Sequence, residues 1–440
     1  MVILFFLLFS FILLLISTLK GYLIIYPLLI SMAILIAILT TRGYSIIYLM
    51  RLAFASSKKS FLVINILLSI GAVIAIWMSA GTIPIIVYYG TKFIQPQYFI
   101  FSAFLFSSLV SILIGTSIGT VSTIGIALMI MSRGSDVNTN IIAGAIIAGA
   151  YFGDRCSPMS SSAHLVATIT ETKINHNLKN MAIATFYPLM VAIIFYLIFS
   201  FTHPVYFSNN NISNSISTVF NLNLITLSPA LIILVLGFLQ VEIKIAMLIS
   251  IIIGFLISIF FQGYSFSEVI RFMIMGFELE GDNILKPVIT GGGIISMVKV
   301  SIIVIVSTAF AGIFAGTKIL ESVDVYLKRI QSRGDLFLGT TIVGVASAAF
   351  GCTQTIAILL TQELIQEKYQ EKQIDNYQLA LDLENTVVVL SPLIPWNIAG
   401  LVPANILTAD FGFIPYAFYL YMIPVFNFFN LKMRDKSVQK

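Results

Sequence analysis

Charged residues are scarce in this sequence of 440 residues, and their scarcity excludes most classes of soluble protein. Lysine and arginine number 24 and aspartate and glutamate 19, so 10% of the residues are charged. Soluble domains carry roughly a quarter. Hydrophobic residues make up 58% of the chain. This composition excludes a soluble enzyme, a secreted disulfide-rich domain and a disordered regulator, and it predicts a protein embedded in a lipid bilayer.

Cysteine is almost absent, and the few metal-binding residue types are scattered. Cys156 and Cys352 both lie inside apolar stretches without a CxxC pair, and His164, His176 and His203 share no metal-ligand spacing. The sequence therefore supports neither redox chemistry nor a metal centre, and we expect no cofactor. It also contains no HExxH motif, and no histidine is placed beside a nucleophile in an obvious motif, which argues against a membrane-embedded hydrolase or acyltransferase.

The net charge of +5 does not indicate a nucleic-acid partner, because the basic residues form short blocks beside apolar runs. These blocks lie at 42–59, 318–333 and 432–440. Basic residues that flank membrane helices mark the cytoplasmic side. We therefore expect a multi-pass protein of the cell membrane (plasma or inner membrane), with the bilayer as partner and both termini in the cytoplasm. Residues 2–18 lack a positive n-region and a cleavage pattern, so we expect a retained first span.

Apolar runs long enough to cross or enter a bilayer occur along the whole chain, enough for on the order of ten crossings. They lie at about 2–18, 22–40, 61–89, 98–131, 140–170, 181–201, 224–239, 245–262, 295–317, 336–365, 378–408 and 413–430. The segment 203–223 has no charged residue other than a histidine and contains six asparagines, which indicates an external loop.

The sidedness of the loops limits how many runs cross. If every run crossed once, 203–223 would be cytoplasmic, so one run in the first half must return to its own side. We expect this run to be 140–170, broken at 153–158, and its counterpart to be 378–408, broken at Ser391-Pro392 and Pro395. Each half contains a second long broken run, so the alternative stays open. Non-helical backbone at membrane depth survives only inside protein or beside a watery cavity, so the breaks mark a site.

Short matches relate the two halves at nearly one spacing. Gly81-Thr82 recurs as Gly316-Thr317, Gly119 with Thr123-Ile124 recurs as Gly351 with Thr355-Ile356, and Ser157-Pro158 recurs as Ser391-Pro392. Five crossings per half is an odd number, so the second copy must be inverted, as in many secondary transporters.

We therefore predict an all-α polytopic membrane protein built from inverted structural repeats. Each repeat would have about five transmembrane helices and a re-entrant hairpin, with broken helices at the midplane. Residues 1–202 would form the first repeat, 203–223 the external loop, 224–431 the second repeat and 432–440 the cytoplasmic tail.

Acidic residues within the broken runs are the first candidates for a site. Asp154 lies deep in its apolar run, where a carboxylate costs about 2.5 to 3.5 kcal/mol on insertion scales and is usually functional. The alternative is a structural ion pair with Arg155. Glu384 lies about halfway along its arm, and both a buried position and the headgroup region fit it. For Asp382 we expect the headgroup region.

Polar residues at the breaks are candidate ligands for an ion or substrate. Ser157, Ser391 and Asn397 flank the two Ser-Pro breaks, where hydroxyls and unwound carbonyls can replace the water shell of sodium. Ordinary turn chemistry explains the same residues.

The second pair of broken runs supplies three further candidates. Thr123, Gln354 and Thr355 lie in the stretches 115–123 and 351–355, which suits a second set of broken helices lining the same cavity. Close helix packing around small residues is the alternative.

Three stretches resemble the NhaC family of sodium/proton antiporters. They are IWMSAGTIPIIVYYG at 76–90, GDRCSPMSSSAHL at 153–165 and LENTVVVLSPLIPWNIAG at 383–400. The similarity spans roughly residues 60–425, and members exchange sodium for protons or, in some relatives, organic acids. The resemblance maps two residues onto the GD-x-x-SP motif and others onto the second-half signature: Asp154 and Ser157, then Glu384, Ser391, Pro392, Trp396 and Asn397.

The sequence departs from the family pattern at two acidic positions. The common SDTTN reads Ser160-Ser161-Ser162-Ala163-His164, so that Ser161 replaces an aspartate. The second-half Glu-Asp pair reads Glu384-Asn385. Fewer buried acids leave fewer groups to carry protons.

We therefore expect a secondary active Na+/H+ antiporter with alternating access. Asp154 would be the carboxylate shared by Na+ and H+, and Ser157 a further Na+ ligand. The alternative is a Na+-coupled or H+-coupled transporter of a small organic acid or amino acid, which the missing carboxylates and the hydroxyl-rich breaks favour. An ion channel fits paired inverted hairpins less well. A homodimer is compatible with the sequence.

Overall fold

The computed structural model describes residues 2–133, 135, 137–206, 211–279, 285–286, 289–317, 319 and 332–438. Within these residues helices account for the regular structure, and the only β pairing is an isolated antiparallel bridge between Phe277 and Gly291. The all-α class predicted from the composition is confirmed.

The helices follow one another with short connections. In the first half they are α1 (Val2–Leu19), α2 (Ile25–Thr41), α3 (Ile46–Ser79), α4 (Thr82–Phe93), η1 (Pro96–Tyr98), α5 (Phe99–Ile114), α6 (Ser117–Thr120), η2 (Val121–Gly125), α7 (Ile126–Ser132), α8 (Thr139–Cys156), α9 (Ser161–Ile169) and α10 (Ile174–Thr202). The π-helical turn η2 joins α6 to α7 without a break, so 117–132 is one helix.

The second half begins after the segment predicted to be an external loop. Its helices are α11 (Asn211–Val219), η3 (Leu224–Leu227), α12 (Ser228–Phe238), α13 (Ile243–Phe260), α14 (Phe266–Met275), η4 (Ile294–Met297), α15 (Val298–Gly316), α17 (Arg333–Gly351), α18 (Gln354–Glu371), α19 (Asn376–Leu383), η6 (Glu384–Val388), η7 (Ser391–Leu393), α20 (Ile398–Ile406), η8 (Phe411–Tyr416) and α21 (Phe418–Val438). The turn η6 is π-helical and continues α19.

In the described part of the chain, six helices are long and apolar enough to cross a membrane, and seven if the bent pair 376–393 and 398–406 counts as one span. The six are Ile46–Ser79, Pro96–Ile114, Ile174–Thr202, Ile243–Phe260, Ile294–Gly316 and Arg333–Gly351. Four shorter apolar helices accompany them. A multi-pass membrane protein is therefore confirmed, whereas five crossings in each half stays a prediction.

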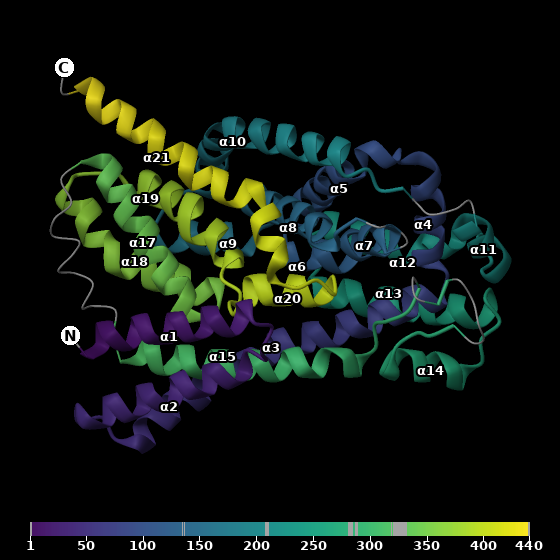
Figure 1. Cartoon of the computed structure of the whole chain (residues 1–440), viewed down its shortest axis with the longest axis horizontal. Helices are drawn as coiled ribbons and strands as arrows, with labels where there is room; N and C mark the ends of the chain where they lie inside the picture. Colours follow the sequence, from purple (N-terminus) through teal and green to yellow (C-terminus); the bar gives the residue numbers. More distant parts are fainter. Residues whose placement is uncertain are drawn as a thin grey trace.

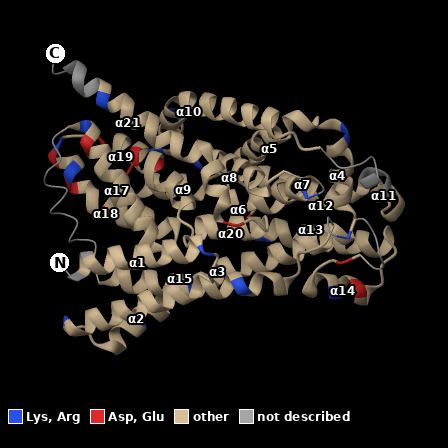
Figure 2. Ribbon diagram, viewed as in Figure 1, with Lys and Arg blue, Asp and Glu red and all other residues tan. Residues whose placement is uncertain are grey.

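The outer surface of the bundle suits lipid. Large apolar side chains point outward, including Leu19 at 78% exposed, Phe93 at 80% and Phe260 at 76%. A soluble protein rarely exposes so many large apolar side chains to water, whereas the acyl chains of lipids are a favourable environment for them. Charged residues gather instead towards the two ends of the bundle, most densely around α17, α18 and α19 (Figure 2).

Both chain termini lie at one end of the bundle, at the left of Figure 1. We call this end the terminal side, and the opposite end, where α4, α11 and α14 lie, the far side. These two names are used below to describe which segments cross the bundle and which return.

A hairpin of α17 and α18 returns to the terminal side. Thr340, in the first half of α17, and Tyr369, near the end of α18, are joined by a hydrogen bond of 3.0 Å between their hydroxyls, so the two helices are antiparallel. The chain reverses at Cys352-Thr353, where Cys352 has a φ of 51° in the left-handed region. The threonine side chain then caps the new helix.

A second hairpin, of α5 and the helix 117–132, returns to the far side. Met131, near the end of α7, contacts Gly90 in α4, just before α5 begins. The chain reverses at Gly115-Thr116, where Gly115 has a φ of 74°. Only glycine adopts this backbone conformation without strain.

These hairpins correct the expectation that 140–170 and 378–408 return. The segment α8–α9 begins beside η8, where Asn140 adjoins Gly412, and ends beside α18, where the Gln362 side chain donates to the Ile169 carbonyl at 3.4 Å. The axes of α19–η7 and α20 bend by 50°, which falls far short of a reversal. A two-residue turn with a left-handed first residue reverses a chain, whereas the Ser-Pro breaks only redirect it.

Candidate functional site

The tip of each hairpin packs against the break in the next segment. In the second half, the Ile398 amide donates to the Cys352 carbonyl at 2.8 Å, and the Trp396 indole donates to the Ala349 carbonyl at 2.6 Å. The Asn397 amide group donates to the Ala348 carbonyl at 2.8 Å. Backbone groups left free by the interrupted helix α17 thus find partners in the break between η7 and α20.

The first half repeats this arrangement with different side chains. The Ser157 hydroxyl donates to the Ile112 carbonyl at 2.7 Å, and Gly115 lies so close to Met159 that a Cβ atom there would come within 2.3 Å of the methionine Cβ. Unwound backbone is therefore buried in protein at both places, as membrane depth requires.

Small residues bring α8 close enough to α5 for this contact. A Cβ atom on Gly149 would lie 2.4 Å from the Phe104 carbonyl oxygen, and one on Gly153 would lie 2.3 Å from the Ser111 Cβ. Such a GxxxG pattern permits close packing of membrane helices. The residue after the second of these glycines is Asp154, so the same packing places the carboxylate at the hairpin tip.

Asp154 is buried, with 6% of its surface exposed. The Ser160 hydroxyl donates to its Oδ1 at 3.2 Å, and Ser117 lies within hydrogen-bonding reach through both its hydroxyl and its backbone amide. Ser117 begins the helix 117–132, and the amides at a helix N-terminus favour negative charge. Two hydroxyls and a helix end therefore surround one carboxylate.

Arg155 is fully buried and is bound by neutral oxygens. It donates to the Thr185 hydroxyl, to the Asn385 side-chain oxygen and, at 3.5 Å, to the Tyr419 hydroxyl. Its Nε has no hydrogen-bond partner within the described residues. Among these residues Arg155 forms no ion pair with Asp154, so the structural pair considered as an alternative does not form in this conformation.

Glu384 lies opposite, at the start of the π-helical turn η6, and is 1% exposed. Neither carboxylate oxygen has a hydrogen-bond partner in the described part of the chain. Electrostatic interactions link it to both Arg155 and Asp154. A π-helical turn inside an α-helix is frequently found at functional sites. The Gln354 side chain, which donates to the Val388 carbonyl at 2.9 Å, ties η6 to the second hairpin tip.

Most of the remaining predicted site residues direct their polar side chains to backbone groups. The Ser391 hydroxyl donates to the Val387 carbonyl at 2.6 Å, and the Thr123 hydroxyl donates to the Gly119 carbonyl at 2.8 Å. Thr355 is exposed on α18. Asn397 caps α20, and Ser157 accepts from the Met159 amide at 3.1 Å. The structure thus brings together Asp154, Glu384 and Asn385. It leaves the other side chains bonded to backbone, apart from the exposed Thr355.

Sequence reasoning missed Ser117 and Ser160 as neighbours of Asp154. Ser117 follows the hairpin tip, and Ser160 caps α9 by accepting from the Ala163 amide at 3.2 Å. The N-cap pattern after the Ser-Pro break was a usable signal for Ser160. No sequence signal identifies Ser117, because it approaches Asp154 only through the reversal of the chain at Gly115.

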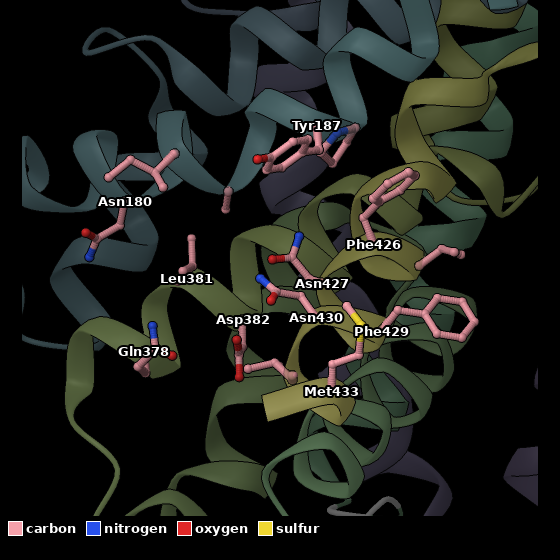
Figure 3. Close-up of a pocket in the computed structure, with 15 residues that line it drawn as sticks. Asn180, Tyr187, Gln378, Leu381, Asp382, Phe426, Asn427, Phe429, Asn430 and Met433 are labelled. Carbon is pink, nitrogen blue, oxygen red and sulfur yellow. The ribbon is translucent and has the colours of Figure 1, made fainter. Parts of the chain in front are cut away.

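Asp382, expected in the headgroup region, is 2% exposed within a closed cluster, and its depth in a bilayer stays a prediction. Arg333 Nη2 is 2.5 Å from its Oδ2, and the Tyr369 hydroxyl donates to the same oxygen at 2.5 Å. The carboxylate also lines a cavity of about 770 Å³ between α10, α19 and α21, which Figure 3 shows together with Asn427 and Asn430.

The atoms around Asp154 that could bind a cation are all oxygens. In the described residues no group of three or more His, Cys, Asp or Glu side chains could hold a metal ion. The oxygens near Asp154 come from one carboxylate and from hydroxyls, which are hard ligands.

Comparison with known proteins agrees with this chemistry. The profile of the Na+/H+ antiporter family matches residues 149–429. A malate-2H+/Na+-lactate antiporter of Bacillus subtilis is 28% identical over 362 residues, covering 80% of this chain and 76% of its own. The Na+/H+ antiporter NhaC of the same organism is 29% identical over 373 residues, covering 83% and 82%.

A third relative, the Na+/H+ antiporter NhaC of Alkalihalophilus pseudofirmus, is 27% identical over 369 residues, covering 82% of this chain and 79% of its own. All three relatives are antiporters, and the matched range contains both breaks and the Asp154, Arg155 and Glu384 residues. The chain belongs to the Na+/H+ antiporter family.

Proposed function

We propose that this protein is a secondary active Na+/H+ antiporter in which Asp154 carries either Na+ or H+. The observation that carries the proposal is the position of this carboxylate, buried where a hairpin tip meets a broken helix and surrounded by Ser117 and Ser160. Burial favours the protonated form of a carboxyl group and a bound cation favours the ionised form. Na+ and H+ therefore compete for one group, and such competition is sufficient for exchange.

The proposed mechanism is alternating access between two inverted repeats, residues 1–202 and 224–431, with the terminal side in the cytoplasm. Two features support it. The hairpins enter from opposite ends of the bundle. The N-cap residues of the two halves also correspond. Thr116 and Thr353 cap the helices that follow the hairpin tips, and Ser160 and Asn397 cap the helices that follow the breaks. The number of residues between the members is the same for both pairs. Labelling of Gln373→Cys with an impermeant maleimide from the cytoplasmic side alone checks the orientation.

The decisive test uses purified protein in proteoliposomes containing a pH-sensitive dye. Asp154→Asn keeps the size of the side chain but cannot exchange a proton, so we expect Na+-dependent proton movement to fall at least about a hundredfold. Asp375→Asn is the matched control, because it also removes a carboxylate but preserves the cap that Asp375 forms for α19. Undiminished exchange by the folded Asp154→Asn protein would place the site elsewhere.

A second candidate function is Na+-coupled exchange of a small organic acid. Arg155 is a fully buried cation held by neutral oxygens, which is an arrangement suited to a carboxylate, and one relative is named a malate-2H+/Na+-lactate antiporter. Labelled lactate and malate, offered under a Na+ gradient in the same vesicles, separate the two functions. Uptake of either acid by the parent protein would favour this second function, and its absence would leave Na+ and H+ as the cargo.

A further inference from the structure

We infer that Arg155 is the resident counter-charge of Glu384, and that the buried cluster of Asp154, Arg155 and Glu384 takes up one monovalent cation per cycle. Na+ and H+ would then be exchanged one for one, without net movement of charge. This inference rests on the proposed antiport function and extends it to the exchange ratio.

The charge of the cluster follows from its members. Two carboxylates and one guanidinium are buried together, and an arginine side chain stays protonated in proteins. The other titratable groups that face them are Tyr151, Cys156 and Tyr419, which are neutral in their ordinary form at neutral pH. With both acids ionised, the cluster therefore carries one net negative charge.

The neighbouring buried charges do not alter this count. Asp382 and Arg333 form their own ion pair at 2.5 Å, which sums to zero. In the described part of the chain, the remaining buried polar residues around the central breaks are serines, threonines and asparagines, which carry no charge.

A single missing charge has a direct consequence at membrane depth. A net charge inside the bilayer is costly, so the form of the protein that reorients is the one in which the cluster is neutral. One Na+ neutralises the cluster, and so does one H+. Two cations at once would leave an excess positive charge, which is disfavoured for the same reason.

The geometry argues against a purely structural role for Arg155. A structural ion pair closes, as Arg333 and Asp382 do. Here Arg155 instead binds Thr185 and Asn385, its Nε has no partner in the described residues, and both oxygens of Glu384 lack hydrogen bonds. The guanidinium balances the carboxylate across a gap and leaves its oxygens available.

The first experiment measures the exchange ratio of the parent protein in proteoliposomes. An imposed pH gradient is balanced against a Na+ gradient until proton movement stops, with the membrane potential clamped at zero by potassium and valinomycin. We expect a roughly tenfold Na+ gradient to balance about one pH unit, because each tenfold ratio contributes equally for the two ions. The exchange rate should not change when the clamped potential is varied.

Balance at about half a pH unit, or a rate that follows the potential, would overturn the inference. If the parent protein moves no protons in response to Na+, the proposed antiport function fails and not only the ratio. The two failures are therefore distinguishable in one preparation.

The second experiment tests the charge count by substitution. Glu384→Gln makes the cluster neutral without cargo, so we expect exchange to fall at least about tenfold. In the double variant Arg155→Gln with Glu384→Gln, the cluster again carries one net negative charge. Exchange should therefore recover to within about threefold of the parent. A merely structural Arg155 predicts that the double variant is at least as impaired as Glu384→Gln. Such a result, in a double variant whose unfolding temperature matches that of the single one, would refute the role of Arg155.

Discussion

Two clusters of buried charge lie in this molecule, and they differ in whether the opposite charges meet. On the terminal side, Arg333 and Asp382 are 2.5 Å apart and Tyr369 donates to the same carboxylate. At the centre, Arg155 binds neutral oxygens and the oxygens of Glu384 remain without hydrogen bonds in the described residues. A closed cluster fastens helices together, whereas an open one retains the capacity to bind a cation. Burial of charge alone thus does not identify a transport site.

The largest expected effect comes from opening the closed cluster. Asp382→Asn leaves Arg333 without a counter-ion, so we expect the free energy of unfolding to fall by about 3 kcal/mol. The measurement is reversible unfolding in mixed detergent micelles. The double variant Asp382→Leu with Arg333→Met removes both charges and should recover most of the loss. A single variant as stable as the parent would show that this pair does not fasten α17 to α19.

A smaller effect is expected from the backbone contact that positions the open cluster. Gly115→Ala introduces a Cβ atom in the left-handed conformation and within 2.3 Å of Met159, so we expect a loss of about 2 kcal/mol. The matched control is Gly21→Ala, because Gly21 has a φ of 68° but nothing within 4 Å of the added atom. It should lose only about 1 kcal/mol. Equal losses in the two variants would mean that the tip does not depend on close contact with the break.

The smallest effect is expected from removing the carboxylate of the central cluster that has no hydrogen bonds. Glu384→Met removes a buried carboxylate that has no hydrogen bonds, so we expect stability in the absence of Na+ to rise by about 1 kcal/mol. Because the cluster then needs no cation, added Na+ should no longer raise the unfolding temperature, as it should in the parent. Thermal unfolding with and without NaCl, with choline chloride as the salt control, measures both. A persistent response to Na+ would mean that Glu384 does not contribute to the cation site.

The sequence was sufficient for the fold class and for the burial of Asp154. Apolar content and the length of the apolar runs determine whether a chain enters a bilayer, so the all-helical membrane class followed from composition. Asp154 stood out because an acid far inside an apolar run is usually functional, whereas the sequence left a buried position and the headgroup region equally open for Glu384. The structure places both in one buried cluster.

The sequence was not sufficient for the path of the chain or for the partners of the acids. The sidedness of loops limits how many segments return, but not which ones, and the reversal at Gly115 and Cys352 depends on backbone conformation. Asp382 and Glu384 lie two positions apart and resemble each other in sequence. They differ because Arg333, distant in the chain, reaches only the first of them.

The hairpin tip at Cys352 has one further consequence, which concerns chemical labelling. This thiol is fully buried against the second break, and Cys156, at the end of α8, is the one other thiol of the chain. A thiol reagent therefore modifies Cys352 only while the tip is undocked, so the natural sequence carries a reporter of its own opening. The rate of that modification, followed as Na+ and pH are varied, gives the frequency with which the tip separates from α20 without any engineered residue.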